Sequence, residues 1–227
     1  GTVAWEQARL AALSKRPLAT ADRRKAWLDL SKSKNLRVRE AALEAMAQSP
    51  APVASQVERR IAQLLASDRW TFVRVGAARA LGAKPRAASG DQALMAAVTK
   101  DGETPTVRAA ALTALGQRKS TSAGELVHDV AADAQEPLAV RIAAVDALGA
   151  LCRRDSAALL YKLALRAGYP ELPYDQQLGM AALAALGAIK PPDVALKLAP
   201  LLSRDMRVPR AVRMIARDVL IRPGTCR

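Results

Sequence analysis

Apolar residues recur along this chain in a ten-residue motif whose clearest copy reads VRVGAARALG. Copies begin at Val73, Val107, Val140 and Leu178, and looser copies begin at Val38 and Val212. By subtraction in chain order, the starts are 35, 34, 33, 38 and 34 residues apart. In the clearest copy, Val73, Ala77, Ala80 and Leu81 have the i, i+4, i+7, i+8 spacing of one face of an amphipathic helix. One such helix in each period of this length predicts a stack of helical hairpins.

Glycine and proline mark the borders of the predicted helices. Glycine closes four motif copies, at Gly82, Gly116, Gly149 and Gly187, where we expect it to end the helix in the left-handed conformation. Proline precedes four copies, at Pro105, Pro137, Pro173 and Pro209, where a helix start needs no backbone donor. A second helical segment lies between motifs, for example at 53–66, 126–134, 156–167 and 194–202. The chain therefore predicts about six hairpins, preceded by an N-terminal helix within residues 4–16.

The motif V-R-x-A-A-L-x-A-L-G, with an acidic residue about five positions upstream, resembles the HEAT-like repeat of bacteria, the type also found in phycobilin lyase subunits. The resemblance covers roughly residues 20–222. It implies an all-α fold, a right-handed α-solenoid, as a single repeat domain over residues 1–227. Because the chain begins at Gly1 without an initiator Met, we expect that it was processed or excised from a longer protein.

Arginine recurs at the second motif position, at Arg39, Arg74, Arg108, Arg141 and Arg213. Acidic residues precede three of these arginines by five or six positions, at Asp68, Glu103 and Glu136. The HEAT resemblance implies that these acids and arginines form a ladder that ties adjacent repeats together, a role that suits the planar, two-sided guanidinium. A row of cations for nucleic acid is the alternative. The fifth copy departs from the pattern with Gly179.

The third and seventh motif positions are expected to line the inner face of the stack. They form a mixed surface without a basic stripe, and its apolar part lies in the C-terminal half. The candidate partner-binding residues are Ile142, Met180 and Met214 at the third position, with Arg79 and Asp146 at the seventh. An exposed apolar strip of this kind marks a protein contact; burial of part of the strip is the alternative.

The net charge of +14 is concentrated near the two ends of the chain. Candidate contacts to phosphate groups or to an acidic partner are Arg23, Arg24 and Lys25 at one end, with Arg207 and Arg210 at the other. Such a field favours acidic partners. The alternative is that charged outer faces keep the terminal repeats soluble.

Residues for enzyme chemistry are scarce. The single histidine, His128, precedes Asp129, and neighbouring side chains on a helix point apart, so this pair forms neither a triad nor a metal site. The sequence has no phosphate-binding glycine loop and no Cys/His cluster of zinc spacing. We therefore expect no enzyme activity, no cofactor and no metal. Alkylpurine DNA glycosylases built of HEAT-like repeats nevertheless resemble this chain in size, charge and architecture.

These observations favour a non-enzymatic protein-interaction scaffold or regulatory subunit, whose partner is another protein with acidic segments. Sequence-independent nucleic-acid binding through the basic ends and a glycosylase-like enzyme are the alternatives. The sequence contains no run of about 18 apolar residues, so it predicts no membrane span. Cys152 and Cys226 match no metal or redox spacing, and the sequence leaves a bridge between them open. A cytoplasmic location is favoured for free thiols, and a periplasmic or secreted one for a bridge.

Overall fold

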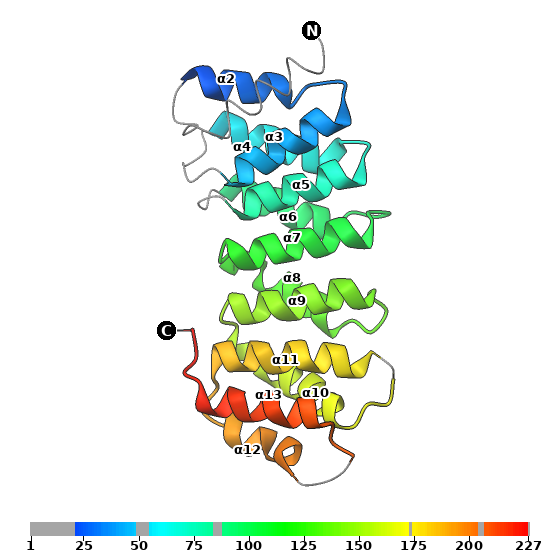
Figure 1. Cartoon of the computed structure of the whole chain (residues 1–227), viewed down its shortest axis with the longest axis vertical. Coiled ribbons are helices and arrows are strands. Elements are labelled where there is room, and N and C mark those ends of the chain that lie inside the picture. Colours follow the sequence, from blue (N-terminus) through cyan, green and yellow to red (C-terminus); the bar gives the residue numbers. More distant parts are fainter. Residues whose placement is uncertain (1–20, 49–54, 84–87, 173, 204–206, 227) are drawn as a thin grey trace. The chain divides into compact units, whose positions relative to one another are not determined.

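The computed structural model describes residues 21–48, 55–83, 88–172, 174–203 and 207–226. Within these ranges the chain forms helices and turns without a strand, which confirms the predicted all-α fold (Figure 1). The chain divides into two compact units, which we call the N-terminal unit, Gly1–Arg118, and the C-terminal unit, Lys119–Arg227. A single domain over 1–227 stays a prediction. The predicted N-terminal helix within residues 4–16 lies outside the described residues.

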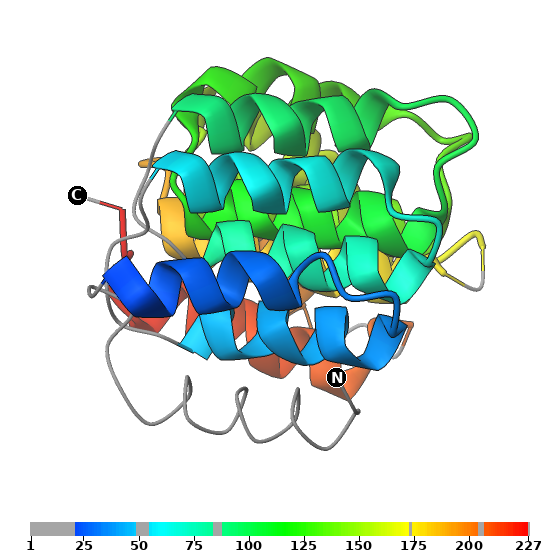
Figure 2. The ribbon, with the colours of Figure 1, turned by 90° about the horizontal axis from the view of Figure 1, so that it is seen from above.

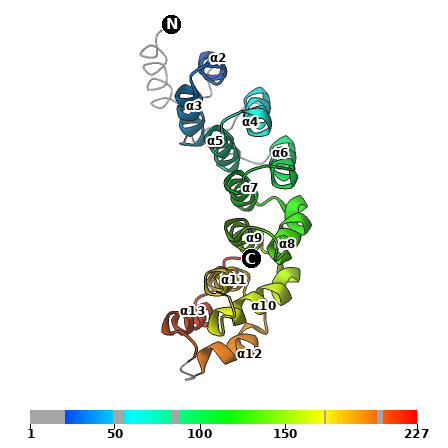
Figure 3. The same cartoon turned by 90° about the vertical axis from the view of Figure 1, so that its right-hand side faces the viewer.

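In the N-terminal unit, the motif forms the helices α3, α5 and α7, which we call motif helices, and the segments between motifs form the intervening helices α2, α4 and α6. Their bounds are α2 Ala21–Leu30, α3 Leu36–Gln48, α4 Ser55–Ser67, α5 Thr71–Gly82, α6 Ala88–Thr99 and α7 Pro105–Gln117. Consecutive motif helices pack on one another, and α4 packs on α6. Within this unit the two kinds of helix form two layers (Figure 3). Seen from above, the helix axes are roughly parallel or antiparallel to one another (Figure 2).

The C-terminal unit repeats this arrangement, with α8 and α12 shorter than the intervening helices of the N-terminal unit. The motif helices are α9 Leu138–Ala150, α11 Asp175–Ile189 and α13 Arg210–Ile221, and the intervening helices are α8 Gly124–Ala132, α10 Ala157–Gly168 and α12 Val194–Leu198. Short 3-10 turns, η1 Thr121–Ala123, η2 Arg154–Ser156 and η3 Ala199–Leu202, adjoin the three intervening helices. The described helices of the chain thus pair as six hairpins, as the period predicts. None of these helices is long and apolar enough to cross a membrane.

The core of each unit is made by the motif itself. The first motif residue is buried in every copy, at Val38, Val73, Val107, Val140, Leu178 and Val212. The alanine at the fifth position is also buried throughout, at Ala42, Ala77, Ala111, Ala144, Ala182 and Ala216. Burial of one such valine or leucine stabilises the fold by about 1.5–3 kcal/mol. Trp27, fully buried, joins α2 to α3 because its indole N–H donates to the Ala42 carbonyl at 2.6 Å.

The glycines that close the motif have a different role from the predicted one. Gly149 and Gly187 lie before the last residue of their helices and Gly82 is the last residue of α5, whereas the glycine of the described residues that has a positive φ is Gly102. A Cβ atom at Gly82 would lie 2.9 Å from the Ala114 Cα, and one at Gly149 would lie 2.8 Å from the Ala185 Cα. The prediction that these glycines terminate the helices is therefore wrong. Gly82 and Gly149 instead allow consecutive motif helices to approach closely, because a Cβ atom at either position would strike the backbone of the neighbouring helix.

Candidate interaction surfaces

The arginine at the second motif position reaches forward to the next repeat. Arg39 Nε donates to Asp68 Oδ2 at 2.7 Å, and Arg39 Nη2 donates to Asp68 Oδ1 at 3.1 Å. The third nitrogen, Arg39 Nη1, donates to the Ser33 carbonyl at 2.8 Å. One guanidinium thus holds its own preceding turn and the carboxylate 29 residues further along the chain. This planar, two-partner geometry is specific to arginine.

Arg74 repeats the arrangement one period later. Its Nε and Nη2 donate to the Glu103 carboxylate at 3.0 and 2.7 Å, and its Nη1 donates to the Asp68 carbonyl at 2.7 Å. Burial alone would raise the pKa of Glu103. The hydrogen bonds from Arg74 and the Thr104 amide, with the positive charges of Arg74 and Lys100, lower that pKa below its ordinary value instead. The pairing therefore stabilises the ionised carboxylate.

The remaining ladder candidates lie in equivalent places. Arg108 Nε donates to the Val98 carbonyl at 2.7 Å, and Arg141, which is buried, donates from Nε to the Ala131 carbonyl at 3.4 Å. Arg213 is half-buried on α13, and Glu136 is half-buried in the turn before α9. In the fifth copy Gly179 replaces the arginine. A Cβ atom there would lie 2.6 Å from the Ala167 Cβ, so α10 occupies the space that a side chain would need.

The three predicted apolar candidates occupy equivalent positions on consecutive motif helices of the C-terminal unit. Ile142 on α9 and Met180 on α11 are half-buried, and Met214 on α13 is 59% exposed. Since α9 packs on α11 and α11 on α13, these three equivalent positions lie on neighbouring helices, and we call the three residues together the apolar strip.

The two charged candidates are separated by the division of the chain. Arg79 is exposed on α5 in the N-terminal unit, and Asp146 is exposed one turn after Ile142 on α9. Partial burial raises the pKa of Asp146. Of the two, Asp146 therefore belongs to the face that carries the apolar strip.

The C-terminal unit is also hollowed between α11, α13 and the C-terminal tail. A concavity of about 330 Å³ is lined by Ala184 and Ala188 from α11, by Ile215 and Val219 from α13, and by Pro223 from the tail. Asp218 and Arg222 form an ion pair of 2.9 Å beside it. Small side chains on α11 and the return of the tail create this space, which the sequence analysis did not find.

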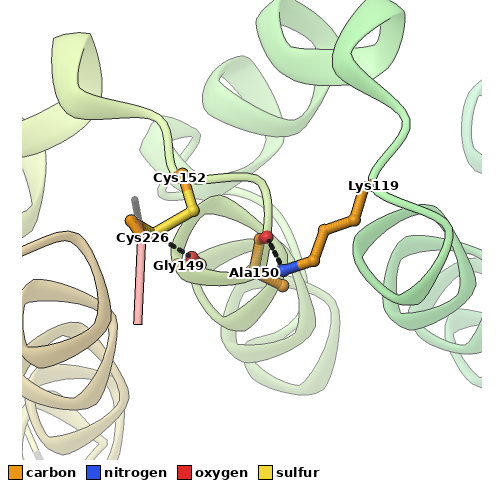
Figure 4. The surroundings of a disulfide bond; sticks show 5 residues. All are labelled: Lys119, Gly149, Ala150, Cys152 and Cys226. Carbon is orange, nitrogen blue, oxygen red and sulfur yellow. Dashed lines mark hydrogen bonds between the residues drawn. A yellow bond between two sulfur atoms is a disulfide. The ribbon is translucent and has the colours of Figure 1, made fainter. Parts of the chain in front are cut away.

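A disulfide holds that tail in place. Cys152 and Cys226 are bonded, with Cα atoms 5.5 Å apart (Figure 4). The Thr225 and Cys226 amides donate to the Ala188 carbonyl at 3.0 and 3.1 Å, which fixes the tail to the end of α11. The sequence left this bridge open. Under the sequence prediction a bridge favours the periplasm or the exterior, and that assignment stays a prediction.

Lysines take the place of Cys152 in the flanking repeats. Lys119, Cys152 and Lys190 all have positive φ, at 54°, 58° and 50°. Lys119 and Cys152 each lie two residues after the end of a motif helix, and Lys190 directly follows α11. Lys119 Nζ donates to the Ala150 carbonyl at the end of α9 (Figure 4). Lys190 Nζ donates to the carbonyls of Val219, Leu220 and Arg222 at the end of α13. These lysines satisfy the last carbonyls of a motif helix.

The histidine candidate lies beside a polar concavity of about 480 Å³ in the C-terminal unit. His128 Nδ1 lies 2.9 Å from Ser156 Oγ, a hydroxyl that is fully buried. Arg153 and Asp155 at the rim pair with each other at 2.5 Å. His128 thus joins α8 to η2. No group of three or more metal-ligating side chains occurs within the described ranges.

Sequence analysis missed a cluster of buried charges in the N-terminal unit. Arg118, with a side chain 0% exposed, donates to Asp91 Oδ1 at 2.7 Å, to Glu58 Oε1 at 3.3 Å and to the Leu81 carbonyl at 2.8 Å. The three residues come from α4, α6 and the end of α7, far apart in the sequence. Because no motif spacing relates them, no local pattern could have found them.

The basic candidates at the two ends have different surroundings. On α2, Arg24 is half-buried and Lys25 is exposed. For Arg23 the structure describes the backbone and not the side chain. Arg207 and Arg210 are exposed near the start of α13, and the Arg207 guanidinium lies 5.5 Å from the centre of the Tyr169 ring. Lys25, Arg207 and Arg210 are therefore accessible to an acidic ligand.

Residues 92–172, from α6 into the turn after α10, match the family of HEAT repeats. The match covers about a third of the chain. HEAT repeats generally serve as protein-interaction scaffolds, and the packed helical hairpins are consistent with an α-solenoid of HEAT-like repeats. No curated protein matches the chain.

Proposed function

We propose that this protein is a non-enzymatic interaction scaffold that binds another protein along the apolar strip of α9, α11 and α13. The observation that carries the proposal is the exposure of Met214, 59% accessible, in line with Ile142 and Met180. A row of large apolar side chains at equivalent positions of three packed helices offers a linear surface. Exposed rows of this kind are used for protein contacts.

Charges at the two ends of the apolar strip indicate the chemistry of the partner. Arg210 is exposed one turn before Met214, and Asp146 is exposed one turn after Ile142. A segment of the partner that crosses α13, α11 and α9 would therefore place an acidic residue near Arg210 on α13 and a basic residue near Asp146 on α9. Its apolar side chains would lie on Met214 and Met180. The acidic part of this segment agrees with the excess of arginine near the end of the chain.

Photo-cross-linking in the protein's own cells tests the proposal. The photoreactive p-benzoylphenylalanine replaces Met214 in the full chain, and adducts are separated and identified by mass spectrometry. We expect one discrete protein adduct. Adding Met180→Glu, which places a charge in the middle of the apolar strip, should lower its yield roughly tenfold, the effect of losing about 1.4 kcal/mol of binding free energy.

A matched control lies in the other layer of the same unit. Leu196 on α12 is also a large apolar side chain, 75% exposed. The photoreactive residue at this position should give no such adduct. Equal adducts from positions 196 and 214, or an adduct at 214 that Met180→Glu leaves unchanged, would contradict the proposed surface.

A further inference from the structure

The N-terminal unit carries a second surface, made of aromatic and basic side chains. Trp70 and Phe72 stack on each other, with ring centres 5.8 Å apart and planes inclined by 16°. Phe72 lies in the first turn of α5 and is 45% exposed. Part of the Phe72 side chain is therefore accessible to solvent beside the Trp70 ring.

A guanidinium lies near each of these rings. The Arg37 guanidinium lies 6.0 Å from the centre of the Phe72 ring, and the Arg69 guanidinium lies 5.1 Å from the centre of the Trp70 ring. Both arginines and Lys34 are exposed. One carboxylate, Glu40, pairs with Arg37 at 2.9 Å, and neither α3 nor α5 has an acidic residue in its first turn. The surroundings of the aromatic pair are therefore net positive.

The ladder fixes this surface. Arg39 binds the carbonyls of the turn that contains Lys34 and also binds Asp68, whose Oδ1 accepts the Trp70 amide at 3.0 Å. Lys34 and Arg69 hold equivalent places four residues before their motifs, and Arg37 and Phe72 hold equivalent places one residue before. The two turns are thus joined through one guanidinium, so the rings and cations are positioned before any ligand binds.

We propose that Phe72, with Arg37, Arg69 and Lys34 around it, is a binding site for single-stranded nucleic acid. One base stacks on the exposed part of the Phe72 ring, and the three cations contact the flanking phosphates. Stacking needs the face of an unpaired base, which a duplex does not offer, and every base has such a face. The site is separate from the apolar strip, which belongs to the C-terminal unit, and does not depend on the scaffold function.

Fluorescence anisotropy of a labelled dT12 strand, titrated with the full chain at several salt concentrations, tests the site. We expect the strand to bind more tightly than a duplex of the same length. Phe72→Ala should weaken binding about 5- to 150-fold, the range for loss of one base–aromatic stack, without changing the salt dependence. Arg37→Gln should lower the slope of log affinity against log salt by about 0.7, the value for one phosphate contact on a single strand. An rU12 strand distinguishes RNA from DNA as the preferred source.

Further variants separate stacking from folding and from net charge. Phe72→Tyr keeps the ring and should bind like the wild type, whereas Phe72→Leu keeps an apolar side chain and should bind like Phe72→Ala. Tyr169→Ala removes another exposed aromatic residue beside an arginine and should leave binding unchanged. The proposal fails if strand and duplex bind equally, if Phe72→Ala and Tyr169→Ala act alike, or if polyglutamate of equal length competes as well as unlabelled dT12.

Discussion

The disulfide and the lysine caps give the most specific prediction about stability. Cys152 holds the left-handed position where Lys119 and Lys190 cap a motif helix, and the tail that it tethers supplies two amides to the Ala188 carbonyl. We infer that the bridged tail replaces a missing lysine cap at the end of α11. The perturbations are Cys152→Ser with Cys226→Ser, which removes the bridge, and Cys152→Lys with Cys226→Ser, which offers a lysine instead.

The expected magnitude follows from the length of chain that the bridge closes. For a separation of 74 residues, the chain-entropy model gives about 4.5 kcal/mol, and measured values are commonly 2–4 kcal/mol. The double serine variant should therefore lose about 2–4 kcal/mol of unfolding free energy. A lysine that reaches the last carbonyls of α11 should restore about 1 kcal/mol, as expected for a charged donor at a helix C-terminus. Serine and lysine tolerate the positive φ about equally, so the comparison isolates the cap.

Urea unfolding followed by two probes measures this effect. The tryptophans Trp5, Trp27 and Trp70 all belong to the N-terminal unit, whereas far-UV circular dichroism reports on all helices. Loss of the bridge should move the circular dichroism transition to lower urea and move the tryptophan transition less. Dithiothreitol should reproduce the serine result, because its two thiols supply two electrons and two protons, become a cyclic disulfide and leave Cys152 and Cys226 as thiols.

Two results would refute this reasoning. If oxidised wild type and the double serine variant unfold at the same urea concentration, the bridge does not stabilise the C-terminal unit. If the lysine variant is no more stable than the serine variant, the tail does not replace a cap.

Three further predictions concern the interior. Arg118→Met leaves Glu58 and Asp91 buried without their cation and should lower the unfolding free energy by about 3–5 kcal/mol, whereas Arg79→Met at an exposed position should change it by less than about 0.5 kcal/mol; urea unfolding followed by tryptophan fluorescence compares them. Gly149→Ala should destabilise the fold by about 1–3 kcal/mol because its Cβ meets the Ala185 Cα at 2.8 Å, whereas Gly187→Ala, whose nearest neighbour is Val219 at 3.4 Å, should be tolerated; equal thermal midpoints would contradict the role of close approach. The pKa of Glu103 is lowered in the folded state, so its contribution to stability is present above the unfolded pKa and is lost as the pH falls through the folded pKa. As the pH falls below about 4.5, the free energy of unfolding of Glu103→Gln should therefore decrease less than that of the wild type. Parallel acid-unfolding curves of the two proteins would argue against this role.

The sequence alone determined the helices, their pairing and the face that each buries. A period near 34 residues and an apolar spacing of 3.6 residues are local properties of the chain, so they predicted all six described motif helices. The same spacing predicted that Ile142, Met180 and Met214 hold equivalent places on their helices, because helix geometry fixes which positions share a face, and the structure leaves Met214 exposed and the other two half-buried. The spacing did not indicate the stacked pair Trp70 and Phe72, since the exposure of a ring depends on its neighbours.

The tertiary structure alone decided which atoms meet across helices. Gly82 and Gly149 suggested helix ends in the sequence, yet they allow close packing, because the interhelical distance is set by both partners. The buried Arg118 and the bridge of Cys152 with Cys226 join residues that no short spacing relates. Periodicity reports which side of a helix is buried, whereas hydrogen bonds, ion pairs and disulfides require particular atoms within a few ångströms. That proximity arises only when the hairpins pack in register.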